Sequence, residues 1–275
     1  MVAPLSGAQS VDRALALLSL VGRHAGRGAS LSQLVADSGL NKPTVRRLLL
    51  ALMRGGLVEQ EDDTRLYFLG EEAYVLGTFA APRFGLLEIC RSSLMRLSET
   101  SQDTSFLSVP REALSLCLYR EEGTYPIRTH ALQAGFEHPL GIGAGSLAIL
   151  AALPDDEVEA TLAANAEAIA TRYPGLPPER IRADVALARR RGFSLNPGLI
   201  VTNSWGVGMA FRFPDGRVAG ALSIAAIDSR MQEPRQEELA SLLRREVDRI
   251  EEKLTALFSR RNGAPDRPQT RRTLK

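Results

Sequence analysis

The chain of 275 residues has few of the side chains on which metalloproteins and many enzymes depend. It contains two cysteines, one tryptophan and three histidines. Cys90 and Cys117 have no metal-ligand spacing, so they exclude a disulfide scaffold and a zinc module and are typical of a reduced, cytosolic protein. Aromatic residues make up only 5% of the chain, but the hydrophobic fraction of 44% is sufficient for a buried core.

Long apolar runs and catalytic motifs are also missing. The longest uncharged stretch, 192–211, is interrupted by Asn196, Pro197 and several glycines, which favours strand and loop over a membrane span. Residues 1–9 contain no basic stretch followed by an apolar run, so we expect no secretion signal. The sequence has no P-loop, Gly-x-Ser-x-Gly elbow or His-Glu-x-x-His motif. We therefore predict no catalytic residue, no metal and no cofactor.

Charge is distributed unevenly along the chain. The formal net charge is +2, yet residues 1–60 carry seven basic and three acidic side chains, and residues 260–275 carry six basic and one acidic. The two ends therefore hold +4 and +5, and about −7 is left for the residues between them. Basic ends on an acidic body indicate binding of a polyanion. The length favours two modest domains over one large domain.

Helix signals follow one another closely in the first sixty residues. Apolar residues at helical spacing predict a helix over 10–24. Ser30 and Gln33 form a capping-box signal for a second helix, which we expect to end at Gly39. Asn41 is a suitable N-cap for a third helix. Two short strands are predicted at 57–60 and 65–69, joined by the polar turn 61–64, and they complete a winged helix-turn-helix.

The third helix is predicted to have a cationic outer face. Lys42, Arg46, Arg47 and Arg54 lie on its flanks and outer side, and no acidic residue occurs between Lys42 and Arg54. A helix of this kind can contact phosphates and base edges in the major groove of DNA. The alternative interpretations are an amphipathic helix with a solvated basic face, or a winged helix that binds a protein.

Three segments resemble the N-terminal domain of IclR-type bacterial transcriptional regulators: Ser10 to Leu15, Gly39 to Leu49, and Tyr67 to Gly70. The resemblance implies that Thr44 and Arg47 contact DNA, with Lys42, Arg46 and Arg65 as their neighbours. The complete set of candidate DNA-binding residues is Lys42, Thr44, Arg46, Arg47, Arg65, Tyr67 and Arg13.

The segment after the wing is predicted to be helical. A helical linker can hold two DNA-binding heads at a fixed separation, so we expect a homodimer or homotetramer. The alternative is that these helices only cover the second domain. The predicted organisation is a flexible N-terminus (1–8), a DNA-binding domain (9–70), a helical linker (71–100), an effector-binding domain (101–260) and a disordered basic tail (261–275).

The second half of the chain changes to strand periodicity. Its predicted strands are 104–109, 113–119, 127–132, 205–213 and 218–227. With helices predicted between the two strand groups, an α+β domain with an antiparallel sheet and helices on one side is the economical architecture. The IclR resemblance continues to Phe258 and implies a GAF-like fold with a pocket for a small effector, commonly an organic acid or an aromatic compound.

A glycine-rich run, 141–146, precedes a predicted helix. Free N–H groups at the start of that helix could hold a carboxylate, or the glycines could merely allow close packing. Trp205 could stack on a flat ligand or belong to the core. The candidate effector-binding residues are Ala144, Gly145, Ser146, Asn196, Asn203, Trp205, Gly206 and Ser223.

These features together predict a DNA-binding transcriptional regulator. Its partners would be a double-stranded operator, a small-molecule effector and further copies of the chain, with no membrane involved. Two other classes stay open: a winged-helix protein-interaction module, and an enzyme acting on small molecules with an added DNA-binding head. Repressor and activator are equally compatible with the sequence.

Overall fold

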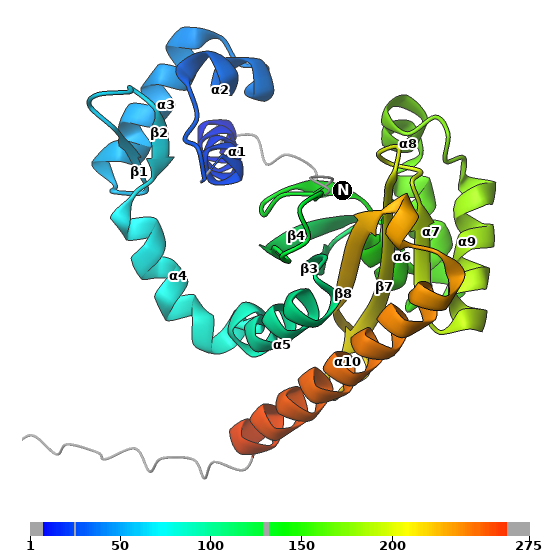
Figure 1. The fold of residues 1–275 in the computed structure, drawn as a ribbon. Helices are drawn as coiled ribbons and strands as arrows, with labels where there is room; N and C mark the ends of the chain where they lie inside the picture. The colour runs from blue at the N-terminus through cyan, green and yellow to red at the C-terminus, as the bar shows by residue number, and fades with distance from the viewer. Residues whose placement is uncertain (1–7, 25, 129–131, 263–275) are drawn as a thin grey trace, which may run out of the picture. The chain divides into compact units, whose positions relative to one another are not determined.

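The computed structural model describes residues 8–24, 26–128 and 132–262, which form two compact units (Figure 1). The first unit comprises Met1–Leu86 with Ala134–Phe136, and the second comprises Leu87–Gln133 with Glu137–Lys275. Each unit has its own core and is described here by itself.

The first unit has the predicted order of three helices and a hairpin, followed by a fourth helix. Its elements are α1 (Gln9–Arg23), α2 (Leu31–Ser38), α3 (Lys42–Arg54), β1 (Val58–Gln60), β2 (Tyr67–Leu69) and α4 (Glu71–Phe84). β1 and β2 pair antiparallel. The winged helix-turn-helix prediction is therefore confirmed.

Local capping explains where these helices begin and end. The Ser30 hydroxyl accepts a hydrogen bond from the Gln33 N–H, and the Gln33 side chain accepts one from the Ser30 N–H. α2 ends at Gly39, whose φ of 63° lies in the left-handed region that favours glycine. The buried residues at the centre of this unit include Leu17, Leu34 and Leu49. These contacts fix the orientation of α3 within its unit.

The second unit is built on a six-stranded antiparallel sheet. The strand order is β5-β4-β3-β8-β7-β6. The strands are β3 (Thr104–Arg111), β4 (Leu114–Glu121), β5 (Glu137–Pro139), β6 (Ser194–Pro197), β7 (Ser204–Arg212) and β8 (Val218–Ile227). The α+β architecture is confirmed, but helices cover both faces of the sheet and not one face, as Figure 1 shows.

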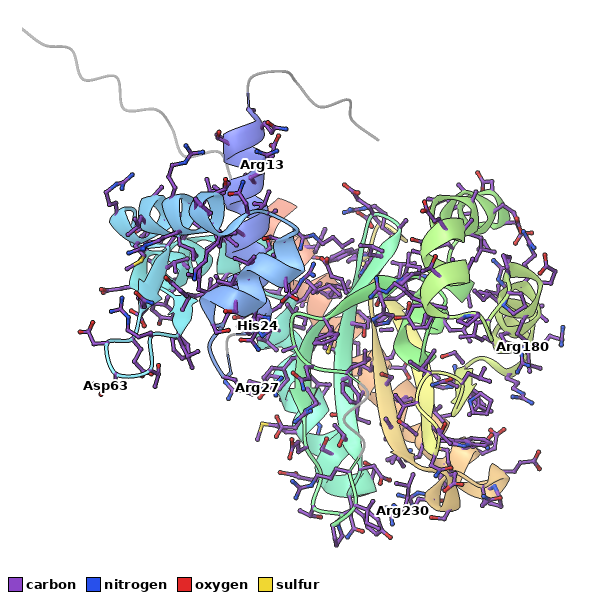
Figure 2. The ribbon with its side chains drawn as sticks, turned by 90° about the horizontal axis from the view of Figure 1, so that it is seen from above. Arg13, His24, Arg27, Asp63, Arg180 and Arg230 are labelled. Carbon is purple, nitrogen blue, oxygen red and sulfur yellow. The ribbon has the colours of Figure 1, made fainter. Side chains whose placement is uncertain are left out.

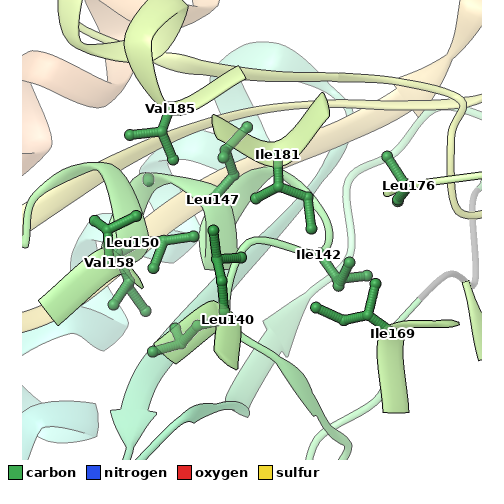
Figure 3. Close-up of a cluster of buried hydrophobic side chains, with 13 residues drawn as sticks. Leu140, Ile142, Leu147, Leu150, Val158, Ile169, Leu176, Ile181 and Val185 are labelled. Atoms are coloured by element: carbon green, nitrogen blue, oxygen red, sulfur yellow. The ribbon is translucent and has the colours of Figure 1, made fainter. Parts of the chain in front are cut away.

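One face of the sheet is covered by four helices: α6 (Ala144–Ala151), α7 (Asp155–Ala164), α8 (Ala166–Arg172) and α9 (Pro178–Arg191). Their apolar side chains form one cluster, which includes Leu150 on α6, Val158 on α7, Ile169 on α8 and Ile181 on α9 (Figure 3). This cluster holds the start of α6 at a fixed place against the sheet.

The opposite face is covered by α5 (Leu86–Ser101) and α10 (Glu233–Asn262). The Ser105 hydroxyl on β3 donates to the Leu94 carbonyl of α5 at 3.0 Å. Arg96 of α5 pairs with Glu246 of α10 at 2.6 Å. The segment predicted as one linker thus contains two helices in different units, because α5 buries Leu94 and Leu97 beneath the sheet.

Two further predictions need correction. Residues 127, 128 and 132 are not in strands, and 129–131 lie outside the described residues; the short strand that pairs with β4 is Glu137–Pro139. The edge strand Ser194–Pro197 was not predicted. Of the predicted tail, residues 261 and 262 belong to α10 and the rest lies outside the described residues, as do residues 1–7. No helix among the described residues has the length and hydropathy of a membrane span.

Candidate functional site

The α3 helix has one buried face and one exposed face. Its buried residues are Val45, Leu48, Leu49 and Leu52. Arg46 and Arg47 are exposed, and Thr44 is half-buried at the first turn. The Asn41 side chain accepts a hydrogen bond from the Thr44 N–H at 2.9 Å and so fixes the start of the helix.

The cations of this exposed face are not neutralised locally. Lys42, Arg46, Arg47 and Arg54 are exposed, and none of them has an ion pair with any residue that the structure describes. The first turn of α3 also contains no acidic residue. The surface therefore presents several free positive charges on one rigid element, which is the electrostatic requirement for binding phosphates.

The other predicted DNA-binding residues differ in how exposed they are. Arg13 is exposed on α1 (Figure 2). Tyr67 is only 6% exposed and belongs to the hydrophobic core, so the prediction that it contacts DNA is corrected. In β2 alternate residues face inward, and Tyr67 is on the inward side.

The wing has a mixed charge. Arg65 is exposed with a φ of 59°, and its backbone carbonyl accepts a hydrogen bond from the Gln60 side chain. The exposed residues Glu61, Asp62 and Asp63 lie in the same turn, and Figure 2 labels Asp63 at its tip. Because this turn holds three carboxylates and one guanidinium, its net charge is negative, and it attracts phosphate less than α3 does.

The start of α6 is the second candidate site. Gly143 is the N-cap of the helix, and no side chain caps it. The first backbone hydrogen bond of the helix runs from the Leu147 N–H to the Gly143 carbonyl. A Cβ added at Gly143 would meet no heavy atom within 4 Å, so the space beside it is open. Free N–H groups at a helix start attract carboxylates.

Two serine hydroxyls lie directly beneath this helix start. The Oγ atoms of Ser108 on β3 and Ser223 on β8 both lie 3.1 Å from the position that a Cβ of Gly145 would occupy. Both serines are buried. The Ser108 hydroxyl has no hydrogen-bond partner within the described part of the chain. It is thus a buried polar group available to a ligand.

Close packing accounts for other members of the predicted pocket. A Cβ at Gly206 would lie 3.1 Å from the Ala144 Cβ. The Ala144 carbonyl accepts a hydrogen bond from the Ser194 hydroxyl at 2.6 Å. The Ser146 hydroxyl donates to the Pro139 carbonyl and accepts from the Gly141 N–H, both at 3.1 Å. These residues shape the loop and the helix start, and the Ser146 hydroxyl is already engaged.

Two predicted effector residues, Trp205 and Asn203, do not gather with the others. Trp205 is the neighbour of Gly206 on β7, and a Cβ at Gly206 would face Ala144 of α6, so the Trp205 side chain lies on the opposite face of the sheet. Asn203 is exposed in the turn before β7, with a φ of 63°. Asn196 pairs with Gly206 and lies on the α6 face, where its side chain accepts a hydrogen bond from the Leu199 N–H.

The sequence did not single out Ser108, Ser115 or His138. The Ser115 hydroxyl and His138 Nδ1 are buried and have no partner among the described residues. Ser115 on β4 pairs with His138 on β5. Burial lowers the pKa of His138 to about 4, so its imidazole is neutral near pH 7. A serine in an otherwise apolar strand is the feature of the sequence that could have drawn attention to Ser108 and Ser115.

No cluster of three metal-ligating side chains occurs in the described ranges. His24 lies 3.2 Å from Asp37 on the first unit. Burial raises the pKa values of the Cys90 and Cys117 thiols to about 12, so neither sulfur is an activated nucleophile.

Comparison with known proteins identifies both domains. The IclR helix-turn-helix domain model matches residues 10–62, and the model of the bacterial transcriptional regulator IclR C-terminal domain matches residues 78–252. The acetate operon repressor of Salmonella typhimurium is 25% identical over 244 residues, 88% of this chain and 88% of that protein.

Solved structures share the fold. An IclR-type regulator from Silicibacter sp. TM1040 is 29% identical with a TM-score of 0.73, covering 89% of this chain and 96% of that chain. An IclR homologue from Microbacterium hydrocarbonoxydans, in complex with 4-hydroxybenzoate, is 21% identical with a TM-score of 0.70, covering 90% of this chain and 99% of that chain. The chain belongs to the IclR family of transcriptional regulators, with an N-terminal DNA-binding domain and a C-terminal ligand-binding domain.

Proposed function

We propose that the exposed face of α3 enters the major groove of an operator, where Thr44, Arg46 and Arg47 contact base edges. Lys42 and Arg13 bind phosphates in this proposal. The observation that carries it is the pair of exposed, unneutralised guanidinium groups on a helix whose opposite face is buried. Arginine is suited to this role because its fork of donors matches guanine O6 and N7.

The experiment is an in vitro selection from random duplexes with the full-length chain. We expect enrichment of a short palindromic sequence. The double variant Arg46→Gln, Arg47→Gln should enrich nothing while it keeps the thermal unfolding profile of the wild type. Enrichment of the same sequence by the double variant would contradict the proposed groove contacts.

We further propose that the chain acts as a homodimer through apolar surface on α1 and α4. Val11 and Leu15 on α1 are 58% and 54% exposed, and Tyr74 and Phe79 on α4 are each 76% exposed. Large apolar side chains in such numbers indicate a surface that another molecule covers. A second copy suits this role because a palindromic operator requires a two-fold symmetric pair of heads.

The effector is proposed to bind beside Gly143, where the N–H groups at the start of α6 and the Ser108 and Ser223 hydroxyls can bind its oxygen atoms. The homologue in complex with 4-hydroxybenzoate supports small aromatic acids as the first probes. A thermal-shift screen of small carboxylic acids tests this, since a ligand of the native state raises the unfolding temperature. Ser108→Ala and Ser223→Ala should each reduce the shift.

Effector binding is proposed to change operator affinity. Coupling free energies between two sites are typically about 1 to 3 kcal/mol, or about 5- to 150-fold in affinity. Gel shifts with and without the stabilising acid show whether the acid weakens or strengthens operator binding. Weaker binding identifies an inducer, and stronger binding identifies a co-repressor or an activator ligand. NMR spectra of the acid during long incubation test the rival enzyme function: conversion of the acid would overturn a purely regulatory role.

A further inference from the structure

A second cleft lies in the C-terminal unit, at the far end of α6 from Gly143. It has a volume of about 330 Å³ and is bounded by α6, α9, α10 and β7, which lie around one edge of the sheet in Figure 1. Its apolar wall consists of Ala148, Ala151, Ala188, Met209 and Val247. Small side chains on three sides leave room for an apolar group.

The floor of this cleft is a piece of β7 that pairs with β8 on one side only. Pairing of β6 with β7 ends at Ser194 and Gly208. Two residues beyond the Ala210 position, the Arg212 N–H donates to Glu251 Oε1 at 2.7 Å, so a carboxylate replaces the missing strand there. Ala210 pairs with Ala221 of β8 on one side, and no residue of β6 pairs with it on the other. Because backbone groups alternate in direction along a strand, its N–H and carbonyl point to the same open side as the Arg212 N–H.

Most charged groups at the rim are already engaged. Arg189 donates to the carbonyls of Ala151 and Leu153 at 2.9 and 2.6 Å. Arg212 donates to the Ala152 carbonyl at 2.6 Å. Glu251 accepts from the Arg212 backbone, as above. These side chains therefore build the cleft and are not free to bind a ligand.

Arg244 and Asp248 are different. Both line the cleft, and neither has an ion pair or hydrogen bond with any residue in the described ranges. They are four residues apart on α10 and therefore share one face, with Cβ atoms about 5–6 Å apart. Arg244 Nη2 lies 2.9 Å from where a Cβ of Gly192 would stand, so the guanidinium lies over that glycine.

We propose that this cleft binds a free α-amino acid with an apolar side chain. Its carboxylate pairs with Arg244 and accepts from the Ala210 N–H. Its ammonium pairs with Asp248 and donates to the Ala210 carbonyl. Its side chain packs on the alanine wall.

The dimensions favour a small ligand. A volume of about 330 Å³ is at the small end of ligand pockets. An extended peptide needs several unpaired strand residues, and here Ala210 alone is open between Gly208 and Arg212. A simple carboxylate would leave Asp248 unpaired beside it, and a simple amine would do the same to Arg244. A zwitterion satisfies both charges at once.

The test is calorimetric titration of the full-length chain with L-valine, L-leucine and L-methionine. Two matched analogues of leucine accompany them: 4-methylpentanoate, which lacks the ammonium, and 3-methylbutylamine, which lacks the carboxylate. We expect saturable binding of at least one amino acid and at least about tenfold weaker binding of both analogues, because each loses a charge-assisted contact. No saturable heat with any of the three amino acids would overturn the proposal.

Variants locate the site. Arg244→Gln and Asp248→Asn should each weaken amino-acid binding at least about tenfold. Arg245→Gln is the matched control, since Arg245 is the exposed neighbour on α10 and does not line the cleft. Ser223→Ala changes a residue of β8 beneath the start of α6 and should leave this binding unchanged. Equal affinity of wild type and Arg244→Gln, or a loss with Ser223→Ala as large as with Arg244→Gln, would overturn the assignment, provided that thermal unfolding shows all variants folded.

Discussion

The side-chain oxygen of Asn41 accepts a hydrogen bond from the backbone N–H of Thr44 at 2.9 Å. This contact satisfies one of the unpaired N–H groups at the start of α3. It also sets the helical phase, so that Arg46 and Arg47 face solvent while Val45 and Leu48 face the core. The cap thus fixes where the helix begins, and the burial of Val45 and Leu48 leaves Arg46 and Arg47 on the solvent side.

Replacement of Arg47 by alanine should weaken binding to the selected operator by about 1 to 3 kcal/mol, or about 5- to 150-fold, since a bidentate base contact has that value. Gel-shift titration measures it. Arg190→Ala removes an exposed arginine from α9 and is the control with equal loss of charge. Unchanged affinity of the Arg47 variant would remove that residue from the interface.

Lys42→Ala should make the affinity for DNA less dependent on salt concentration. Each phosphate contact contributes about −0.9 to the slope of log affinity against log salt concentration, so the variant's slope should be shallower by about that amount. Binding to unrelated duplexes should weaken by a similar factor, because a phosphate contact carries no sequence information. A wild-type affinity that does not respond to salt would favour the protein-interaction module.

The double variant Tyr74→Ser, Phe79→Ser should shift the chain from dimer to monomer, because it removes two of the most exposed apolar side chains on α4. Analytical ultracentrifugation over a range of concentrations measures the dissociation constant. Val201→Ser, which removes a 45% exposed apolar residue from the second unit, is the control and should leave the association unchanged. An unaltered mass for the α4 variant would place the interface elsewhere.

Gly208→Ala should destabilise the second unit by about 1 to 3 kcal/mol, the usual cost of overpacking. The new Cβ would lie 2.6 Å from the Ala144 carbonyl oxygen and 2.8 Å from the Ser194 hydroxyl. Urea unfolding followed by Trp205 fluorescence reports on this unit. Gly175→Ala, where a Cβ meets nothing within 4 Å, should change the midpoint little.

The buried His138 predicts lower stability in acid. The pKa of its imidazole is about 4 in the folded unit, against 6.5 for an unperturbed histidine. The unfolded chain therefore takes up a proton below pH 6.5 while the folded chain does not until about pH 4. The free energy of unfolding should fall over this window by up to about 3 kcal/mol.

His138→Gln removes this titration and keeps an N–H donor for the Ile142 backbone, with which the imidazole is hydrogen-bonded. The difference in unfolding free energy between wild type and variant, measured by urea titration from pH 7.5 to pH 4, should narrow as the pH falls. A difference that is constant over this range would assign the acid sensitivity to other groups.

Sequence patterns predicted the first unit almost completely, because its helices are bounded by local signals such as Ser30 with Gln33 and Asn41. They predicted the second unit less well. Residues 127–132 have strand-like composition, but the strand beside β4 lies at 137–139, where pairing with Ser115 and Leu116 decides the matter. The composition of a short segment does not show with which distant segment it pairs.

The candidate ligand site shows the same limit. The helix start at Gly143 follows from the glycine-rich run, whereas the Ser108 and Ser223 hydroxyls beneath it depend on the register between β3 and β8. Neighbouring residues of a strand face opposite sides of the sheet, and this rule alone separates Trp205 from Gly206. The prediction that placed both residues in one pocket did not apply the rule. The exposed apolar side chains of α4, Tyr74 and Phe79, could not be predicted either, because exposure depends on which other residues pack against the helix.

The two outer strands of the sheet have a consequence for how copies of this protein associate. β5 has three residues, β6 has four and ends in Pro197, and past β6 the Arg212 N–H is already taken by Glu251. Among the described residues, a neighbouring molecule therefore finds only three backbone positions on β5 and four on β6 onto which a further strand could be added. Short outer strands of this kind disfavour the addition of a further strand at β5 and β6 themselves.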